Sequence, residues 1–250
     1  MDPFGTTRSR LARDHALIAP ESFVRAPLPG WQGARGVVPI APALGARFAQ
    51  FLAFVEPGGT AGPAAPGVER AVYVVEGEVE IELAPGVPHA LGPGGFAYLP
   101  PDGDFPLRAI AASQLCVFEK PYAPRAGLAP PEARVGDSRD VAGEPFLGDP
   151  DARLQVLLPD EPAFDLAVNI FTFQPGATLP MVEVHVMEHG LLMLGGQGVY
   201  RLSDAWYPVQ AGDVIWMASY CPQWFVAMGK APARYLYYKD VNRDPLGPSA

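Results

Sequence analysis

Cysteine, basic residues and long apolar runs are all scarce in this chain. Its two cysteines, Cys116 and Cys221, lie outside any C-x-x-C pattern, so neither a disulfide framework nor a zinc knuckle is expected. Lysine and arginine number 18 against 27 acidic residues, which argues against nucleic acid or an anionic membrane as a partner. No segment approaches ~18 uninterrupted apolar residues, and the N-terminal stretch has no apolar run of signal-peptide length. We therefore expect a soluble, cytoplasmic protein.

Helical periodicity is also missing, whereas turn residues are abundant. The chain contains 30 prolines and 27 glycines. They separate short runs rich in Val, Ile, Tyr and Trp, such as AVYVVEGEVEIEL and RYLYYK. Runs of about 4–8 such residues between turn signals are typical of an all-β sandwich or barrel. At 250 residues the chain is long enough for one large domain or for two of about half that size.

The same order of signals occurs twice along the chain. In the first half it reads FLAFVEPGG, AVYVVEGEVEIEL and GPGGFAYLPPDGDF. In the second half it reads NIFTFQPGA, LLMLGGQGVYRL and VQAGDVIWMASYCPQW. The glycines of the matched stretches lie at steady offsets of 118, 119 and 117 residues, in the pairs Gly58 and Gly176, Gly77 and Gly196, and Gly95 and Gly212. Such a steady offset indicates an internal duplication.

The duplication predicts two β-barrels in tandem. We place an N-terminal arm at 1–40, an N-terminal barrel at 41–120 and a C-terminal barrel at 151–250. The stretch between the barrels, 121–150, is rich in Pro, Gly and Ala and is predicted to be a linker.

The segment MVEVHVMEHGLLML, residues 181–194, places two of the chain's four histidines in apolar surroundings. Within it His185-Val-Met-Glu188-His189 matches the H-x-x-E-H of the inverted zinc peptidases, a motif that requires a helix. In a strand, by contrast, Glu183, His185 and His189 would share one face, because strand side chains repeat every two residues.

The flanks of this segment favour the strand. Pro180 precedes it, Gly190 follows the second histidine, and Val182, Val184 and Val186 are β-branched. Such residues fit a pleated surface better than a helix interior. We therefore predict a strand that presents one carboxylate and two imidazoles on one face.

The spacing of these residues resembles the motifs of the cupin superfamily, a jelly-roll barrel. Glu183, His185 and His189, followed by Gly196, fit G-x5-H-x-H-x3,4-E-x6-G in spacing but not in every letter. The closing His of the second motif, G-x5-P-x-G-x2-H, falls at Gln223. The same register in the first half gives residues unsuited to a hard cation, so the N-terminal barrel is expected to hold no metal; the four positions are Ala64, Pro66, Arg70 and Pro106.

A ligand set of Glu, two His and Gln is unusual, and it resembles specifically the bicupin family of (S)-ureidoglycine aminohydrolases. The stretches EVHVMEHGLLMLGGQGVYRL, WYPVQAGDVIWM, PQWF and YLYYKDVNRDP carry the resemblance, which runs from the early LPGW to the C-terminus. It implies a tandem jelly-roll fold, a homo-oligomer assembled through the cupin barrels, and a small ureido compound as the partner. It also implies metal-dependent hydrolysis of (S)-ureidoglycine to (S)-ureidoglycolate and ammonia in the allantoin branch of purine breakdown.

The resemblance implies roles for individual residues as well. Glu183, His185, His189 and Gln223 would hold Mn²⁺, since a mixed N/O set without thiolate suits a harder divalent ion, with Fe²⁺, Ni²⁺ or Zn²⁺ as substitutes in vitro. The substrate pocket would contain Glu183, Tyr200, Gln223, Tyr235 and Lys239. Glu183 is the candidate base and Lys239 the cation for the substrate carboxylate. Tyr235, Tyr237 and Lys239 have the same parity, so in a strand they would face one way.

Two other classes of function fit the bare cupin spacing. One is a bicupin that binds a metal or a small ligand without catalysis, and the other is an iron-dependent bicupin dioxygenase or isomerase. Of the remaining polar residues, we expect His15 and His89 to lie at the surface and Glu188 to be either solvated or an outer neighbour of the metal ligands.

Overall fold

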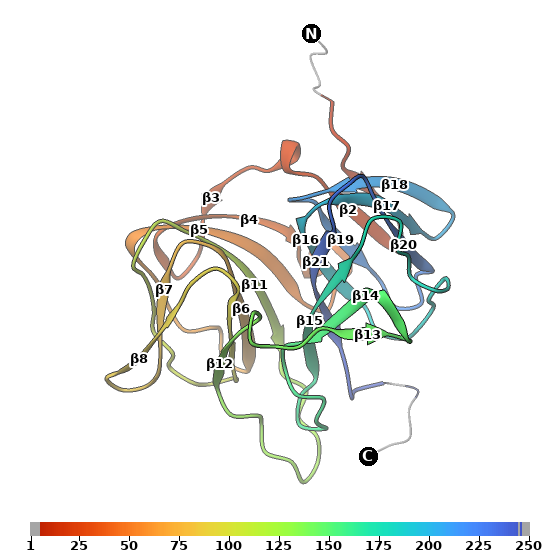
Figure 1. The fold of residues 1–250 in the computed structure, drawn as a ribbon. Helices are drawn as coiled ribbons and strands as arrows, with labels where there is room; N and C mark the ends of the chain where they lie inside the picture. Colours follow the sequence, from red (N-terminus) through yellow and green to blue (C-terminus); the bar gives the residue numbers. More distant parts are fainter. Residues whose placement is uncertain (1–5, 245, 247–250) are drawn as a thin grey trace. The chain divides into compact units, whose positions relative to one another are not determined.

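The chain folds almost entirely into β-strands, as the sequence predicts (Figure 1). The computed structural model describes residues 6–244 and 246. The only helical elements in this described part are single 3₁₀ turns at Pro20–Ser22 and Pro42–Leu44. None of its helices therefore has the length and apolar character needed to cross a membrane.

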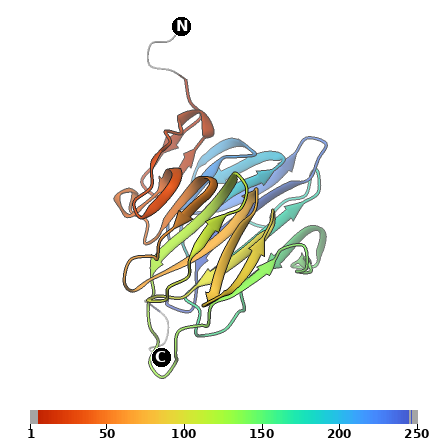
Figure 2. The same cartoon turned by 90° about the vertical axis from the view of Figure 1, so that its left-hand side faces the viewer.

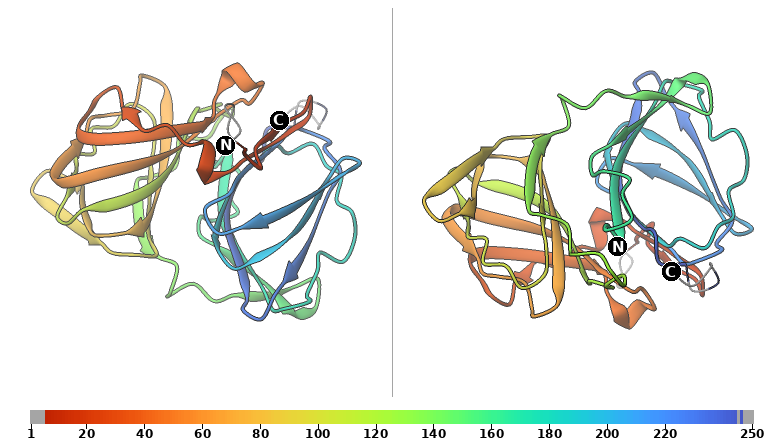
Figure 3. Two further views of the ribbon diagram at one scale, coloured as in Figure 1. Left: turned by 90° about the horizontal axis from the view of Figure 1, so that it is seen from above. Right: turned by 90° about the horizontal axis from the view of Figure 1, so that it is seen from below.

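The strands form two compact units. The N-terminal unit contains Val24–Ala142, Leu157–Ala167 and the described residues from Val241 onward. The C-terminal unit contains Gly143–Val156, Val168–Asp240 and the described residues up to Phe23. In end-on views the strands of each unit curve around that unit's own core (Figure 3).

The N-terminal unit is a ten-stranded antiparallel sheet that closes over one core (Figure 2). Its main path runs β12-β9-β6-β11-β5-β10-β7-β8, with β4 paired to β5 and β3 to β4. Buried Val, Leu, Ile, Ala and Phe side chains fill the interior. The strands are β3 (Ala26–Pro27), β4 (Trp31–Ile40), β5 (Ala49–Ala61), β6 (Val68–Glu76), β7 (Val79–Ala84), β8 (Val87–Leu91), β9 (Gly95–Leu99), β10 (Leu107–Ala109), β11 (Ser113–Pro121) and β12 (Arg134–Asp137).

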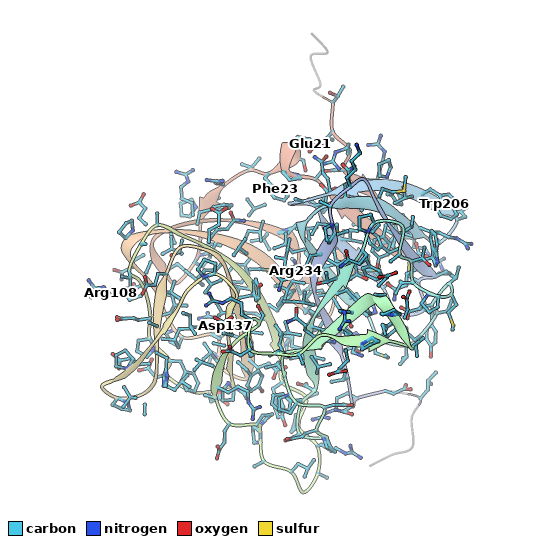
Figure 4. All side chains as sticks on the ribbon, in the orientation of Figure 1. Glu21, Phe23, Arg108, Asp137, Trp206 and Arg234 are labelled. Atoms are coloured by element: carbon cyan, nitrogen blue, oxygen red, sulfur yellow. The ribbon has the colours of Figure 1, made fainter. Side chains whose placement is uncertain are left out.

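The C-terminal unit consists of an eight-stranded and a three-stranded sheet. The larger runs β1-β2-β19-β16-β21-β15-β14-β13 and the smaller β18-β17-β20. On β18 the side chains alternate, so that Val209 is buried whereas Trp206 is 57% exposed (Figure 4). The strands are β1 (Arg10–Leu11), β2 (His15–Ile18), β13 (Glu144–Phe146), β14 (Asp149–Val156), β15 (Leu166–Phe173), β16 (His189–Gly195), β17 (Gln197–Leu202), β18 (Ala205–Gln210), β19 (Val214–Met217), β20 (Gln223–Met228) and β21 (Ala233–Asp240).

Strands also occur in the segments that the sequence suggested as an arm and a linker. Within 1–40, β2 pairs with β19 of the C-terminal unit and β4 pairs with β5 of the N-terminal unit. Within 121–150, β12 pairs with β9 and β13 pairs with β14. The partners of β2 and β12 lie far away in the sequence, so local composition does not reveal those pairings, whereas β13 pairs with the next strand along the chain.

The glycine turns of the two halves correspond in conformation as well as in order. Gly77 and Gly196 have φ values of +85° and +72°, and a Cβ atom at either would lie 2.3 or 2.4 Å from a backbone carbonyl oxygen. Only glycine fits such a position. One alignment from the sequence needs correction: Gly94 at φ +93°, and not Gly95, corresponds to Gly212 at φ +90°, which moves that offset to 118 residues.

Candidate metal and substrate site

The histidine-rich segment is extended, but most of it is not a regular strand. Residues 181–188 run as a loop, and β16 begins only at His189. The single sheet contact in this loop is at Glu183, whose backbone N–H donates to the Gln223 carbonyl at 2.8 Å and whose carbonyl accepts from the Gln223 N–H at 3.0 Å. The prediction of a strand over this segment was wrong in that respect. The helix required by the peptidase motif is absent from these described residues.

Three of the four predicted ligands already have their donor groups in contact. The Nε2 atoms of His185 and His189 are 3.3 Å apart, and the Gln223 amide nitrogen is 3.0 Å from His185 Nε2. Half a turn of that amide would place the Gln223 oxygen at the same position. The fourth predicted ligand, Glu183, lines the same cavity.

The register of the larger sheet places the remaining site residues. His189 on β16 lies opposite Lys239 on β21 and opposite Met217 on β19. Tyr235, Tyr237 and Lys239 alternate along β21, and all three contribute to one cavity of about 170 Å³. The cavity is lined by Phe146, Leu154, Phe171, Glu183, His185, Met187, His189, Leu191, Tyr200, Met217, Gln223, Tyr235, Tyr237 and Lys239.

Burial and the charge of Lys239 set the protonation of this cavity. Burial lowers the pKa of His185, and Lys239 lowers it further. The pKa of His189 lies well below its ordinary value because the ring is fully buried and close to His185 and Lys239. Burial raises the pKa of Glu183, and Lys239 partly offsets this. Both imidazoles are therefore neutral near pH 7, with lone pairs available to a cation.

The phenols at the site keep their protons. Burial raises the pKa values of Tyr200, Tyr235 and Tyr237. The Tyr200 hydroxyl donates to the Gln223 side-chain oxygen at 3.5 Å, and the Tyr237 hydroxyl accepts from the Asn169 amide at 3.1 Å. The site thus combines a cluster of neutral nitrogen and oxygen donors, one carboxylate, one ammonium and several hydroxyl donors, an arrangement suited to holding a divalent cation beside a small anionic molecule.

Comparison with known proteins identifies the fold of both halves. Residues 169–238 match the family model described as "Cupin domain", and residues 43–122 match "EutQ-like cupin domain". The (S)-ureidoglycine aminohydrolase of Arabidopsis thaliana is 45% identical over 244 residues, covering 97% of this chain and 80% of that protein. The chain belongs to the (S)-ureidoglycine aminohydrolase family. Its Escherichia coli member is 35% identical over 234 residues, covering 92% of this chain and 89% of that one.

Solved structures agree with this family assignment. Protein Ylba from E. coli superposes with a TM-score of 0.84 at 33% identity, with 96% of each chain covered. A Bacillus subtilis oxalate decarboxylase superposes with a TM-score of 0.71 at 10% identity, with 96% of this chain and 79% of that one covered, which shows a shared fold alone. The family resemblance and the tandem jelly-roll fold inferred from the sequence are confirmed.

The N-terminal barrel of this family member does not fit a metal. Arg70, at one of the four positions that correspond to ligands, is buried. Its guanidinium donates to Glu119 at 2.6 Å and to the Gly62 carbonyl at 2.8 Å. A fixed guanidinium at that position would repel a divalent cation.

The sequence misplaced His15 and missed most of the apolar lining. His15 is 3% exposed and not a surface residue. Of the two alternatives for Glu188, burial excludes the solvated one: its Oε2 accepts from Trp216 Nε1 at 3.4 Å. Phe146 and Leu154 reach the cavity from β13 and β14. The short continuous apolar run after His15, Ala16–Ala19, was the available signal that β2 is a buried strand.

Proposed function

We propose that this chain hydrolyses (S)-ureidoglycine to (S)-ureidoglycolate and ammonia in the allantoin branch of purine breakdown. One observation carries the proposal: the side chains of His185, His189 and Gln223 meet at 3.0 and 3.3 Å in a cavity that also contains Lys239. Relatives named for this activity align with 97% of the chain. A cavity of about 170 Å³ suits a small metabolite and not a polymer.

We propose Mn²⁺ as the metal, held by Glu183, His185, His189 and Gln223. Neutral imidazoles, an amide oxygen and a carboxylate, without thiolate, form a set that manganese accepts. When bound, the metal would supply positive charge that orients the substrate carboxylate and a neighbouring heteroatom.

The protein's own side chains would then orient the substrate and move its protons. The Lys239 ammonium would pair with the substrate carboxylate, and the hydroxyls of Tyr200 and Tyr235 would donate hydrogen bonds. Glu183, whose pKa is raised by burial, would accept a proton from water as the water oxygen bonds to the carbon that bears the carboxylate. The bond from that carbon to the amine breaks, and the proton held by Glu183 passes to the amine, which leaves as ammonia. The same residues serve an order in which ammonia leaves before water adds.

Ammonia release from freshly prepared ureidoglycine tests this proposal. Protein stripped with a chelator should be inactive, and Mn²⁺ should restore the release of one ammonia per substrate with the ureido group intact. Only one stereoisomer should be consumed, because the site fixes one face of the reacting carbon. Formation of glyoxylate and urea faster than the uncatalysed decay, or equal consumption of both stereoisomers, would overturn the assignment.

We further infer a cytoplasmic location, which the scarcity of cysteine suggests, and assembly of several copies through the cupin barrels, which the family resemblance implies. Sedimentation of the purified protein measures the assembly, and a monomer at micromolar concentration would contradict it.

A further inference from the structure

Three polar residues that have none of the roles above lie near the proposed metal ligands; two of them, His15 and Cys221, are buried, whereas Asp14 is partly exposed. Asp14, His15 and Cys221 have ligand-type atoms within 4.8 Å of one another. These atoms are already engaged in hydrogen bonds: Asp14 accepts from Ser203 Oγ and from His15 Nδ1, the latter at 2.8 Å, and His15 Nε2 is 2.8 Å from the Tyr207 hydroxyl. Burial raises the pKa of the Cys221 thiol to about 11. We therefore do not interpret these three residues as a second metal site.

Within this group, His15 lies in register with the proposed ligand His189. On adjacent strands His15 faces Met217, Met217 faces His189, and His189 faces Lys239. Directly opposed residues project from the same face of a sheet, and two strand spacings amount to roughly 10 Å. His15 and His189 thus lie on one face of the sheet with a single strand between them.

The loop 218–222 connects this group with two of the proposed ligands. The Tyr220 N–H donates to the His185 carbonyl at 2.7 Å, and the loop leads directly into Gln223. Tyr220 has φ +63°, a left-handed conformation that costs a non-glycine residue energy and needs surrounding contacts to hold it. The geometry of both ligands therefore depends on what fixes this loop.

Asp14 and Ser203 fix the loop at both ends. The Ala218 N–H donates to the Asp14 carbonyl at 2.9 Å, and the Ser203 N–H donates to the Pro222 carbonyl at 2.8 Å. The Ser203 hydroxyl joins the two ends by donating to the Asp14 carboxylate. Burial raises the pKa of Asp14, but the hydrogen bonds from Ser203 and His15 outweigh it and hold the pKa below its ordinary value.

We propose that the hydrogen bond between Asp14 and Ser203 is a latch that positions loop 218–222, and through it His185 and Gln223, for metal binding. Asp14 and Ser203 are positioning residues, since neither lines the cavity. The inference rests on the proposed metal set. If the latch acts in this way, the N-terminal segment supports the metal site, although the ligand motifs of the sequence do not include that segment.

The test compares Asp14→Ala, Ser203→Ala and the double variant with Ser22→Ala. Ser22 is a matched control because its hydroxyl also holds the N-terminal segment, and among the described residues its hydrogen bonds go to the Ala19 carbonyl at 2.8 Å and to Ser9 Oγ at 2.7 Å. Mn²⁺ affinity is measured by calorimetry without substrate, and amide hydrogen exchange is followed in peptides covering 218–223. Circular dichroism and the melting temperature of the metal-free proteins record the fold.

Each latch variant should bind Mn²⁺ about tenfold more weakly, at the lower end of the ~10- to 100-fold typical of groups that orient ligands. Exchange at Tyr220 and Gln223 should quicken. The double variant should bind no more weakly than Asp14→Ala alone, because Ser203→Ala removes a hydrogen bond that Asp14→Ala has already removed. Ser22→Ala should match the unaltered protein.

A lower melting temperature with unchanged Mn²⁺ affinity would show a merely structural role and overturn the latch. If Asp14→Ala does not fold, Ser203→Ala decides the question by the same measurements. If the unaltered protein binds Mn²⁺ and the latch variants lose affinity, the latch stands even where ureidoglycine proves not to be the substrate. If the unaltered protein binds no Mn²⁺, both the proposed metal site and the latch are refuted.

Discussion

Replacing Lys239 with methionine would remove one charge from the site and little else. Lys239 faces His189 across the β16–β21 pairing, and it is the single lysine or arginine among the described residues that line the cavity. Methionine keeps an unbranched stem of similar length, so the packing beside Tyr237 is retained. The variant therefore isolates the contribution of the ammonium group.

The expected loss follows from the role assigned to that group. A hydrogen bond to a charged partner contributes about 1.5–3 kcal/mol, which corresponds to roughly a ten- to 150-fold fall in kcat/KM. Because the ammonium binds the substrate carboxylate from the start, KM should rise. Manganese content should not fall, since removing a positive charge beside Glu183 and the two histidines reduces the repulsion felt by a cation.

The assay is ammonia release as a function of ureidoglycine concentration, together with elemental analysis of the same samples. Lys230→Met is the matched control, because Lys230 is exposed in the turn before β21 and should be silent. Kinetic constants equal to those of the unaltered protein would remove Lys239 from the substrate site. Loss of manganese in the variant would refute the separation between metal binding and carboxylate binding.

Three further perturbations test other parts of the reasoning. Glu183→Gln should keep its manganese, since an oxygen remains for the metal, but turnover should fall by the ~10²–10⁴ typical of general acid–base catalysis; turnover within threefold of the original would exclude Glu183 as the base. Elemental analysis should find one metal per chain, and His185→Ala should lose metal and activity while its circular dichroism spectrum is retained; two metals per chain would contradict the single-site assignment. The last concerns Glu69 in the N-terminal barrel, which is buried against Asp165, Lys120 and Tyr98. Burial, and then the hydrogen bond with Asp165, raise the pKa of Glu69 to about 8 from an ordinary 4.5. Between these values the folded chain holds a proton that the unfolded chain releases, so the free energy of unfolding should decrease as the pH rises from about 4.5 to about 8. Urea titrations at several pH values should show this decrease and its flattening in Glu69→Gln; an equal slope in both proteins would refute it.

Local signals in the sequence determined the fold class and most of the candidate ligands. Short β-branched runs between glycines and prolines predict strands because side-chain alternation and turn chemistry act over only a few residues. The positive φ of Gly77 and Gly196 is a requirement of the same local kind. The shared parity of Tyr235, Tyr237 and Lys239 predicted that they face one way, and all three line one cavity.

Strand register, which is a tertiary property, decided the rest. The Glu183–Gln223 pair joins residues forty positions apart, and its two hydrogen bonds are the single strand-type contact of residues 181–188, which otherwise run as a loop although their sequence alternates like a strand. His15 is buried because its partner Tyr207 lies 192 residues away and β2 pairs with β19. Nothing near His15 in the sequence encodes that contact. Alternation tells which face a side chain takes, but which strands pair, and in which register, depends on the packing of the whole barrel.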